Sequence, residues 1–474
     1  MAKILTPDIC VIGGGAAGLS VAAGAAAFGV PVVLVEHGRM GGDCLNYGCV
    51  PSKALIAAAK HADAIRKAAE FGIASAEPIV DHEHLTARIQ SVIEAIAPHD
   101  SAERFTSLGV EVIKETARFV DDRTVAAGDR MIRARRFVVA TGSSPAIPPI
   151  PGLAETPFLT NETLFGLKRL PRHLLVIGAG AVGLEMAGAH RRLGADVTVV
   201  DSAAALSGQD PELAAIVLDG LRAEGMLLHE RTVIRSAEQT ETGIRLICEN
   251  ESGPFEIEGS DLLVAAGRAP NHGSLDLDAA GIRHCPKHVE VGADLRTSNR
   301  RVYAVGDAAG GLFTHQASYH ARLVLQQILF RLPGRERTTI VPQVIFTAPE
   351  LAQVGLTEER ARESARGART VRLDFSASDR ARTDGLDRGL IKIVVGRRGR
   401  VLGAGIAGPG AGEMMIGLWA FAVANRLTLR HFQTYVAPYP TLSEIGKQAA
   451  ISYYSPMARN RLLRTAIRFM RNFG

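Results

Sequence analysis

Residues 9–36 read ICVIGGGAAGLSVAAGAAAFGVPVVLVE, and they indicate how the N-terminal part of the chain folds. The first four residues and Val32–Val35 are apolar runs that predict two buried strands. Between them, Gly13, Gly15 and Gly18 have the spacing G-x-G-x-x-G and lead into an alanine-rich segment that predicts a helix. Residues 9–35 contain no charge, and a run of this length could also cross a membrane, but six glycines interrupt it. We therefore predict a strand, a helix and a second strand.

The same pattern recurs 165 residues further along the chain. Each copy has an apolar strand, three spaced glycines, a helix, a second strand and an acidic residue, such as Glu36, 23 positions after the first glycine. In the second copy these features are Leu174–Ile177, Gly178, Gly180, Gly183, Val197–Val200 and Asp201. A single glycine motif is weak evidence, because glycine-rich turns also occur in plain α/β packing. Two complete copies predict two dinucleotide-binding units.

The physical chemistry of the motif explains this expectation. The first glycine makes a tight turn, the second lets the backbone approach a pyrophosphate, and the third lets helix and strand pack closely. The helix N-terminus offers free N–H groups to the phosphates. The acid at the end of the second strand accepts hydrogen bonds from a ribose diol.

Composition and charge exclude several classes of protein. With 47% hydrophobic and 22% charged residues, the chain is neither disordered nor fibrous. The net charge of +5 is mild, and no basic stripe is interleaved with aromatic residues, so we expect no nucleic-acid binding. Residues 1–8 carry no secretory signal, and a cytoplasmic location is therefore expected.

A cysteine pair follows the first dinucleotide unit. Cys44 and Cys49 lie in GGDCLNYGCVPSK, residues 41–53. Five cysteines in 474 residues are too few for a disulfide scaffold, so the pair points to catalysis or metal binding. Beside a dinucleotide site the pair suggests a redox-active disulfide, and a thiolate near a helix N-terminus has a lowered pKa. Two buried thiols, or half of a metal site with a spacing unusual for zinc, are the alternatives.

The pattern Gly-Gly-x-Cys-x-x-x-Gly-Cys-x-Pro-Ser-Lys between two dinucleotide fingerprints resembles the flavin-dependent pyridine nucleotide–disulfide oxidoreductases. That family includes lipoamide dehydrogenase, glutathione reductase and mercuric reductase. The resemblance covers residues 8–455 and implies an α/β fold. Two Rossmann-like dinucleotide-binding domains, for FAD and NAD, would be followed by an α+β C-terminal dimerisation domain.

The resemblance and the turn signals divide the chain into four regions. An FAD-binding domain is expected at 1–150 and 271–340, an NAD(P)-binding domain at 151–270, an interface domain at 341–458 and a tail at 459–474. In the interface domain we expect strands at 342–347 and 390–395, and glycine-rich turns at 403–412. In the family this domain joins two subunits, so the resemblance implies a homodimer with a shared active site.

The resemblance also implies roles for individual residues. Electrons would pass from NADH through FAD to the Cys44–Cys49 disulfide and then to a small acceptor. Cys49 would lie against the isoalloxazine as the charge-transfer thiolate, and Cys44 would be the interchange thiol. Lys53 would lie near flavin N5 and pair with Glu185. The expected cofactor-binding residues are Gly13, Gly15, Gly18, Glu36, Gly42, Lys53, Thr141, Gly142, Gly178, Gly180, Gly183, Asp201, Gly267 and Asp307, the last on the ribityl side of the flavin.

The second fingerprint indicates which nicotinamide cofactor is preferred. A carboxylate at Asp201 accepts a hydrogen bond from a ribose 2′-hydroxyl and repels a 2′-phosphate. Residues 202–209 contain no arginine that could bind such a phosphate, and Gly183 at the third motif position fits NAD. We therefore expect NAD(H) to be preferred over NADP(H), although mercuric reductases usually use NADPH.

One segment departs from the members that reduce thiol compounds. Those enzymes carry a His-Pro near the C-terminus and a Glu five residues after the His. Here Tyr439 precedes Pro440, while Glu444 is kept. A tyrosine, with a pKa near 10, is a poor general base at neutral pH, so dithiol exchange would be slowed. The resemblance implies that Tyr439 and Glu444 act across the subunit interface.

The Pro-Tyr segment is similar to that of mercuric reductases, so we predict an enzyme of that kind that reduces a metal ion or another small acceptor. No cysteine pair follows within residues 451–474, and no metal-carrier domain is expected before residue 8, which puts mercury itself in doubt. One alternative is a dihydrolipoyl dehydrogenase-like reductase with Tyr in place of the catalytic His. Another is a non-enzymatic flavin redox sensor or docking protein.

The C-terminal tail has the pattern of a basic amphipathic helix. Arg461, Arg464, Arg468 and Arg471 fall on one side of a predicted helix at 459–473. The other side carries Leu462, Leu463, Ala466, Ile467, Met470 and Phe473. Such a helix could contact anionic lipid or an acidic partner, or it could pack on its own subunit.

Overall fold

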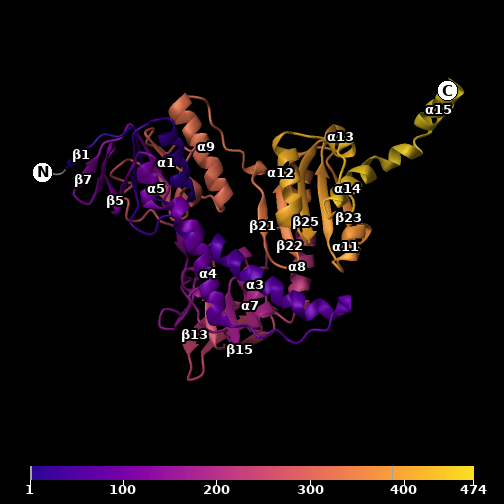
Figure 1. Ribbon diagram of the computed structural model, residues 1–474, viewed down its shortest axis with the longest axis horizontal. Coiled ribbons are helices and arrows are strands. Elements are labelled where there is room, and N and C mark those ends of the chain that lie inside the picture. Colours follow the sequence, from indigo (N-terminus) through magenta and orange to yellow (C-terminus); the bar gives the residue numbers. More distant parts are fainter. Residues whose placement is uncertain (1–2, 387, 474) are drawn as a thin grey trace. The chain divides into compact units, whose positions relative to one another are not determined.

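The computed structural model describes residues 3–386 and 388–473 (Figure 1). The chain forms two compact units, Met1–Ser202 with Arg231–Glu336, and Ala203–Glu230 with Arg337–Gly474. Within the described ranges, no helix is long and apolar enough to cross a membrane. The four-region boundaries drawn from the sequence stay a prediction.

The first unit contains a five-stranded parallel sheet with the order β20-β8-β2-β3-β4. The strands are β2 (Ile9–Ile12), β3 (Val32–Val35), β4 (Val110–Ile113), β8 (Arg136–Val139) and β20 (Val302–Ala304). Strand β2 is buried on both faces: Val11 packs with helices α1 (Ala16–Ala27) and α9 (Thr314–Phe330), and Ile12 packs with Phe119 on the other side. Because both faces are covered, β2 and β3 are wholly apolar. The strand–helix–strand prediction for residues 9–36 is confirmed.

A second parallel sheet in this unit contains β11 (Asp196–Val200), β10 (His173–Ile177) and β16 (Asp261–Val264), in that order. The unit's smaller strands are β1 (Lys3–Leu5), β5 (Ala117–Asp121), β6 (Thr124–Ala127), β7 (Arg130–Ile132), β9 (Ser143–Pro145), β13 (Val233–Gln239), β14 (Ile244–Asn250), β15 (Gly253–Gly259), β17 (Arg268–Pro270), β18 (His284–Cys285) and β19 (His288–Val289). Its other α-helices are α2 (Gly42–Asn46), α3 (Cys49–Lys67), α4 (His82–Ile96), α5 (Ala102–Ser107), α6 (Asn161–Leu164) and α7 (Ala181–Leu193). The second glycine motif therefore repeats the β–α–β arrangement of the first, in β10, α7 and β11.

Helix α7 contains a buried histidine that makes the stability of this unit depend on pH. His190 is only 1% exposed, and its Nδ1 lies 2.8 Å from the carbonyl oxygen of Met186. Burial lowers the pKa of His190 from 6.5 to about 4. Between these values the unfolded chain binds a proton that the folded chain does not, so the free energy of unfolding falls as the pH falls. We expect His190 to account for a loss of about 2 kcal/mol between pH 7 and pH 5.

Urea unfolding at the two pH values measures this loss. The variant His190→Gln can still donate a hydrogen bond to Met186 but cannot be protonated, so it should show a smaller pH dependence than the wild type. Equal pH dependence in the two proteins would contradict the assignment.

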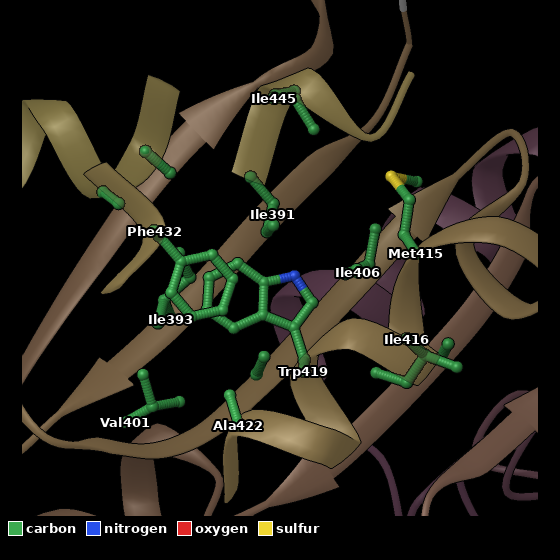
Figure 2. Close-up of a cluster of buried hydrophobic side chains, with 14 of the residues drawn as sticks. Ile391, Ile393, Val401, Ile406, Met415, Ile416, Trp419, Ala422, Phe432 and Ile445 are labelled. Carbon is green, nitrogen blue, oxygen red and sulfur yellow. The ribbon is translucent and has the colours of Figure 1, made fainter. Parts of the chain in front are cut away.

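The second unit is built on a five-stranded antiparallel sheet with the order β21-β22-β25-β24-β23. Its strands are β21 (Gln343–Ile345), β22 (Glu350–Gly355), β23 (Arg369–Asp374), β24 (Leu390–Val395) and β25 (Val401–Gly408). The short strand β12 (Leu227–His229) is not part of this sheet. Its α-helices are α8 (Pro211–Ala223), α10 (Glu358–Ser364), α11 (Asp379–Thr383), α12 (Ile416–Ala424), α13 (Leu429–Thr434), α14 (Glu444–Tyr454) and α15 (Arg461–Met470). Trp419 and Phe432 stack at the centre of its core, with ring centroids 4.2 Å apart (Figure 2).

The prediction of glycine-rich turns at 403–412 is wrong for most of that range. Residues 401–408 form β25, the middle strand of the sheet. A Cβ atom at Gly403 would overlap the carbonyl oxygen of Leu356, and one at Gly405 would lie 2.5 Å from Leu213 Cδ1 on α8. These glycines therefore allow close packing within a strand, a use that local sequence does not distinguish from a turn.

Candidate active site

The two glycine motifs adopt the same backbone geometry. Gly13 and Gly178 each have a φ of +109°, a conformation that favours glycine. A Cβ atom at Gly18 would overlap the carbonyl oxygen of Gly13, and one at Gly183 would overlap that of Gly178. The third glycine of each motif thus lets the helix pack directly against the turn that precedes it.

The acidic residue of each motif is fixed beside its own glycine turn. The Oε2 atom of Glu36 accepts a hydrogen bond from the backbone N–H of Gly14 at 2.5 Å. The Oδ2 atom of Asp201 accepts one from the backbone N–H of Ala179, the corresponding position in the second motif, at 2.6 Å. Glu36 also accepts a hydrogen bond from the N–H of Gly38. Both carboxylates are therefore held at the carboxyl end of the parallel strands, where nucleotides bind in folds of this type.

The residues around the first motif fit a bound dinucleotide such as FAD. Gly42, with a φ of +62°, lies so close to the motif that a Cβ atom there would be 2.7 Å from Cα of Gly15. The hydroxyl of Thr141 is buried and has no hydrogen-bond partner among the described residues. Leaving a buried hydroxyl unpaired costs about 1–3 kcal/mol, so a polar group of a bound molecule would stabilise it.

The cysteine pair lies at a break between two helices. Helix α2 ends at Asn46, and α3 begins at Cys49, so Cys44 and Cys49 belong to different helices. Tyr47 and Gly48 lie between them with non-helical backbone angles. Both cysteines carry free thiols in the structure. This break brings two sulfurs that are five positions apart in the sequence within hydrogen-bonding reach of each other.

The two thiols have opposite pKa shifts. A hydrogen bond from Cys44 lowers the pKa of Cys49 to about 6, and Thr314 and the charge of Lys53 act in the same direction. The same hydrogen bond, together with burial, raises the pKa of Cys44. At neutral pH, Cys49 therefore carries the negative charge and Cys44 keeps its proton. Cys49 is also the more exposed of the two sulfur-bearing residues.

Lys53 and Glu185 form an ion pair next to the cysteines. Their Nζ and Oε2 atoms are 2.6 Å apart, and they join α3 to α7. Glu185 is only 7% exposed, so the ammonium group compensates a buried carboxylate. Lys53 lies four positions after Cys49 on α3, which places the two side chains on one face of the helix. The structure thus brings together the pair expected from the sequence, while its contact with the flavin stays a prediction.

Two groups that the sequence analysis did not select also belong to this site. The Oγ1 atom of Thr314, at the start of α9, lies 3.4 Å from the Sγ atom of Cys49. The Nη2 atom of Arg268 lies 3.2 Å from Oδ1 of Asp43 and donates to the carbonyl oxygen of Ser143 at 2.6 Å. Neither position is marked by a periodic pattern, and only the tertiary fold brings them to the cysteine segment.

The Arg268 guanidinium also reaches Asp307. Its Nε atom lies 3.8 Å from the Oδ2 atom of Asp307, and that oxygen accepts a hydrogen bond from the hydroxyl of Ser143. Burial raises the pKa of Asp307, although the hydrogen bond and the guanidinium act in the opposite direction. Arg268 therefore links Asp307 to Asp43 of the cysteine segment, and Gly267 next to it has a φ of +124°.

Tyr439 and Glu444 belong to the second unit. Tyr439 is 68% exposed, and its hydroxyl donates a hydrogen bond to the Oδ2 atom of Asp379 at 3.1 Å. This hydrogen bond and the charge of Asp379 raise the pKa of Tyr439, and the charge of Glu444 adds to the effect. Glu444 is the first residue of α14. Tyr439 thus keeps its proton at neutral pH, and less of it is available as a general base than in an unpaired tyrosine.

Comparison with known proteins agrees with this fold and site. Residues 7–322 match the model of the pyridine nucleotide-disulphide oxidoreductases, and residues 341–450 match the dimerisation domain of the same family. A mercuric reductase from Streptomyces lividans is 34% identical over 468 residues, which is 95% of this chain and 97% of the relative. A dihydrolipoyl dehydrogenase from Bacillus subtilis is 29% identical over 94% of this chain and 98% of its own length.

Two solved structures are similar over almost the whole chain. LpdA from Mycobacterium tuberculosis has a TM-score of 0.86 and 28% identity, covering 95% of this chain and 99% of its own. The Cu(II) complex of the HOCl-induced flavoprotein disulfide reductase RclA from Escherichia coli has a TM-score of 0.82 and 27% identity, covering 93% and 98%. The chain belongs to the pyridine nucleotide-disulphide oxidoreductase family. It is thus a FAD-dependent pyridine nucleotide-disulphide oxidoreductase that is similar to mercuric reductases, and the predicted fold class is confirmed.

Proposed function

We propose that this enzyme takes electrons from NADH, in preference to NADPH, and passes them by way of Cys44 and Cys49 to a thiophilic metal ion. The observation that carries the choice of acceptor is the hydrogen bond from Tyr439 to Asp379. A dithiol or disulfide substrate needs a proton acceptor near the cysteines. Family members with that activity have a histidine at this position. This chain has Tyr439, whose hydroxyl already donates a hydrogen bond to Asp379.

The cofactors would be held by the two glycine motifs. Glu36, Thr141 and Asp307 would contact FAD, together with the glycines of the first motif and Gly42. Asp201 would bind the ribose of NADH, and its carboxylate would repel a 2′-phosphate. FAD, when bound, carries electrons between the reduced nicotinamide and the cysteine pair. The dimerisation domain supports a homodimer, and we propose that Tyr439 and Glu444 act at the partner subunit's cysteine pair.

The chemistry of the cysteine pair favours a soft cation. Thiolates bind soft transition-metal ions more strongly than oxygen ligands do. Cys49, with a pKa of about 6, is a thiolate at neutral pH and is exposed. Cys44 would release its proton when the metal ion binds both sulfurs. The relatives support this class of acceptor, because one is a mercuric reductase and another was solved as a Cu(II) complex.

A panel of acceptors, assayed as NADH oxidation, tests the proposal. We expect the wild type to turn over with Hg(II) or Cu(II) and to be slow with lipoamide. In Tyr439→His, lipoamide turnover should rise by ~10²-fold, the usual effect of a positioned acid–base group, while metal-ion turnover should not rise.

Tyr435→His is the matched control, because Tyr435 is an exposed tyrosine four positions earlier in the same segment. It should not raise lipoamide turnover. Wild-type turnover with lipoamide that equals or exceeds turnover with metal ions would refute the proposed acceptor class. Equal rates with NADPH and NADH would refute the proposed role of Asp201.

A further inference from the structure

The last α-helix has no packing partner among the described residues outside its own short segment. Helix α15 (Arg461–Met470) begins after Asn460, whose side chain accepts hydrogen bonds from the N–H groups of Leu462 and Leu463. Every residue from 455 to 473 is exposed. Figure 1 shows α15 standing apart from the sheet of its own unit. Packing of the tail on its own subunit, one of the alternatives from the sequence, is not observed.

Helix α15 and the turn after it separate charged and apolar side chains completely. At about 100° per residue, Arg461, Arg464, Arg468 and Arg471 fall within an arc of about 80°. The opposite arc, about 160° wide, holds only apolar residues. They are Leu462, Leu463, Ala466, Ile467, Phe469, Met470 and Phe473. Several are highly exposed, including Leu462 at 82% and Phe473 at 76%.

The charge of the C-terminal segment limits which kind of partner can cover the apolar arc of α15. Residues 445–474 contain no aspartate or glutamate. Their cationic residues are Lys447, Arg459, Arg461, Arg464, Arg468 and Arg471. Pairing the apolar arcs of two tails would leave the arginines of each helix on the outside, beside one another at spacings of three and four residues and without a compensating acid, which is unfavourable. The apolar arc and the arginines together therefore need a partner whose surface is negatively charged and whose interior is apolar.

We propose that residues 459–473 dock the enzyme on an anionic lipid bilayer. The helix would lie in the plane of the interface, with its apolar arc at the acyl boundary and its arginines among the headgroups. A bilayer matches this pattern better than a folded acidic protein, because an apolar arc of this width needs no pocket of matching shape. The absence of acidic residues fits the negative surface potential of such a membrane. The proposal is independent of which acceptor the enzyme reduces.

Co-sedimentation of the full-length, FAD-loaded protein with vesicles tests the proposal. Vesicles of phosphatidylglycerol and phosphatidylcholine provide the anionic surface, and vesicles of phosphatidylcholine alone provide the neutral one. We expect binding to the anionic vesicles, at least ~10-fold weaker binding to neutral ones, and weaker binding at high salt. In a Phe469→Trp variant the emission of the new indole should shift to shorter wavelengths on binding. The native Trp419 is buried, so its own emission should not change.

Three double variants separate the contributions of charge and of apolar area to vesicle binding. Arg464→Glu with Arg468→Glu reverses charge in the polar arc, and Leu463→Ser with Ile467→Ser removes apolar area. Each should reduce vesicle binding at least ~10-fold and leave NADH oxidation unchanged. Arg366→Glu with Arg397→Glu makes the same charge change at exposed positions outside the tail and should bind like the wild type.

Three results would overturn the proposal. The first is a wild type that does not bind anionic vesicles. The second is a loss of binding in the Arg366 and Arg397 control equal to the loss in the tail variant. The third is binding to polyglutamate without binding to vesicles, which would identify an acidic protein as the partner. All the substituted side chains are exposed, so folding of the variants can be verified by their thermal midpoints.

Discussion

Replacing Cys49 with serine is expected to lower NADH-dependent reduction of every acceptor by at least ~10³-fold, because a serine hydroxyl can neither form the disulfide nor carry the thiolate charge. Cys44→Ser should have a loss of similar size. The measurement is steady-state NADH oxidation with the acceptor panel described above. Cys248→Ser is the control, since Cys248 is buried in β14 and burial raises the pKa of its thiol to about 11.

The same site makes a prediction about pH. Only the thiolate reacts with iodoacetamide, so alkylation of Cys49 in the reduced protein should follow a titration with a midpoint near pH 6. Above that pH the rate should be constant, and below it the rate should fall about ten-fold per pH unit. Peptide mapping by mass spectrometry distinguishes Cys49 from the other cysteines.

Two variants at position 44 show whether the hydrogen bond from Cys44 is responsible for the lowered pKa of Cys49. Cys44→Ser keeps a donor to the thiolate, so the midpoint for Cys49 should stay near 6. Cys44→Ala removes the donor that contributes most to the lowered pKa, so the midpoint should rise. A midpoint that is the same in both variants would mean that Thr314 and Lys53 set the pKa of Cys49 instead.

Gly183→Ala is expected to destabilise the protein by more than ~3 kcal/mol, because the added Cβ atom would overlap the carbonyl oxygen of Gly178. That oxygen belongs to the backbone, so the overlap is relieved only if α7 moves away from the turn after β10. Thermal unfolding and the amount of folded protein obtained measure the effect.

Gly180→Ala is the matched substitution in the same motif. Apart from its neighbours in the chain, none of the described residues has an atom within 4 Å of a Cβ atom built at Gly180, so the fold should tolerate the substitution. If this glycine lets the backbone approach a pyrophosphate, the methyl group should raise the KM for NADH by ~10-fold and leave the thermal midpoint unchanged. Equal thermal midpoints for the two variants would show that the packing of Gly183 is not the source of the destabilisation.

The sequence predicted the parts of the fold that depend on near neighbours. Strands β2, β3, β10 and β11 appear where apolar runs border a glycine motif. Strand β25 was missed because Gly403 and Gly405 look like turn residues until α8 and the chain at Leu356 pack against them. Local signals cannot report a partner that is distant in sequence.

For the site, the sequence by itself determined the two glycine turns, the acid that follows each of them, and the placing of Cys44, Cys49 and Lys53 on one segment, because these features depend on residue type and spacing along the chain. Tertiary structure decided what surrounds them. Thr314 lies 265 positions from Cys49 and contacts it only because α9 and α3 meet in the first unit. Arg268, at the start of β17, likewise reaches Asp43 and Asp307 only through the tertiary fold. Hydrogen bonds and charge interactions act through space, so the pKa of Cys49 depends on the folded arrangement, whereas the identity of the pair is encoded in the chain.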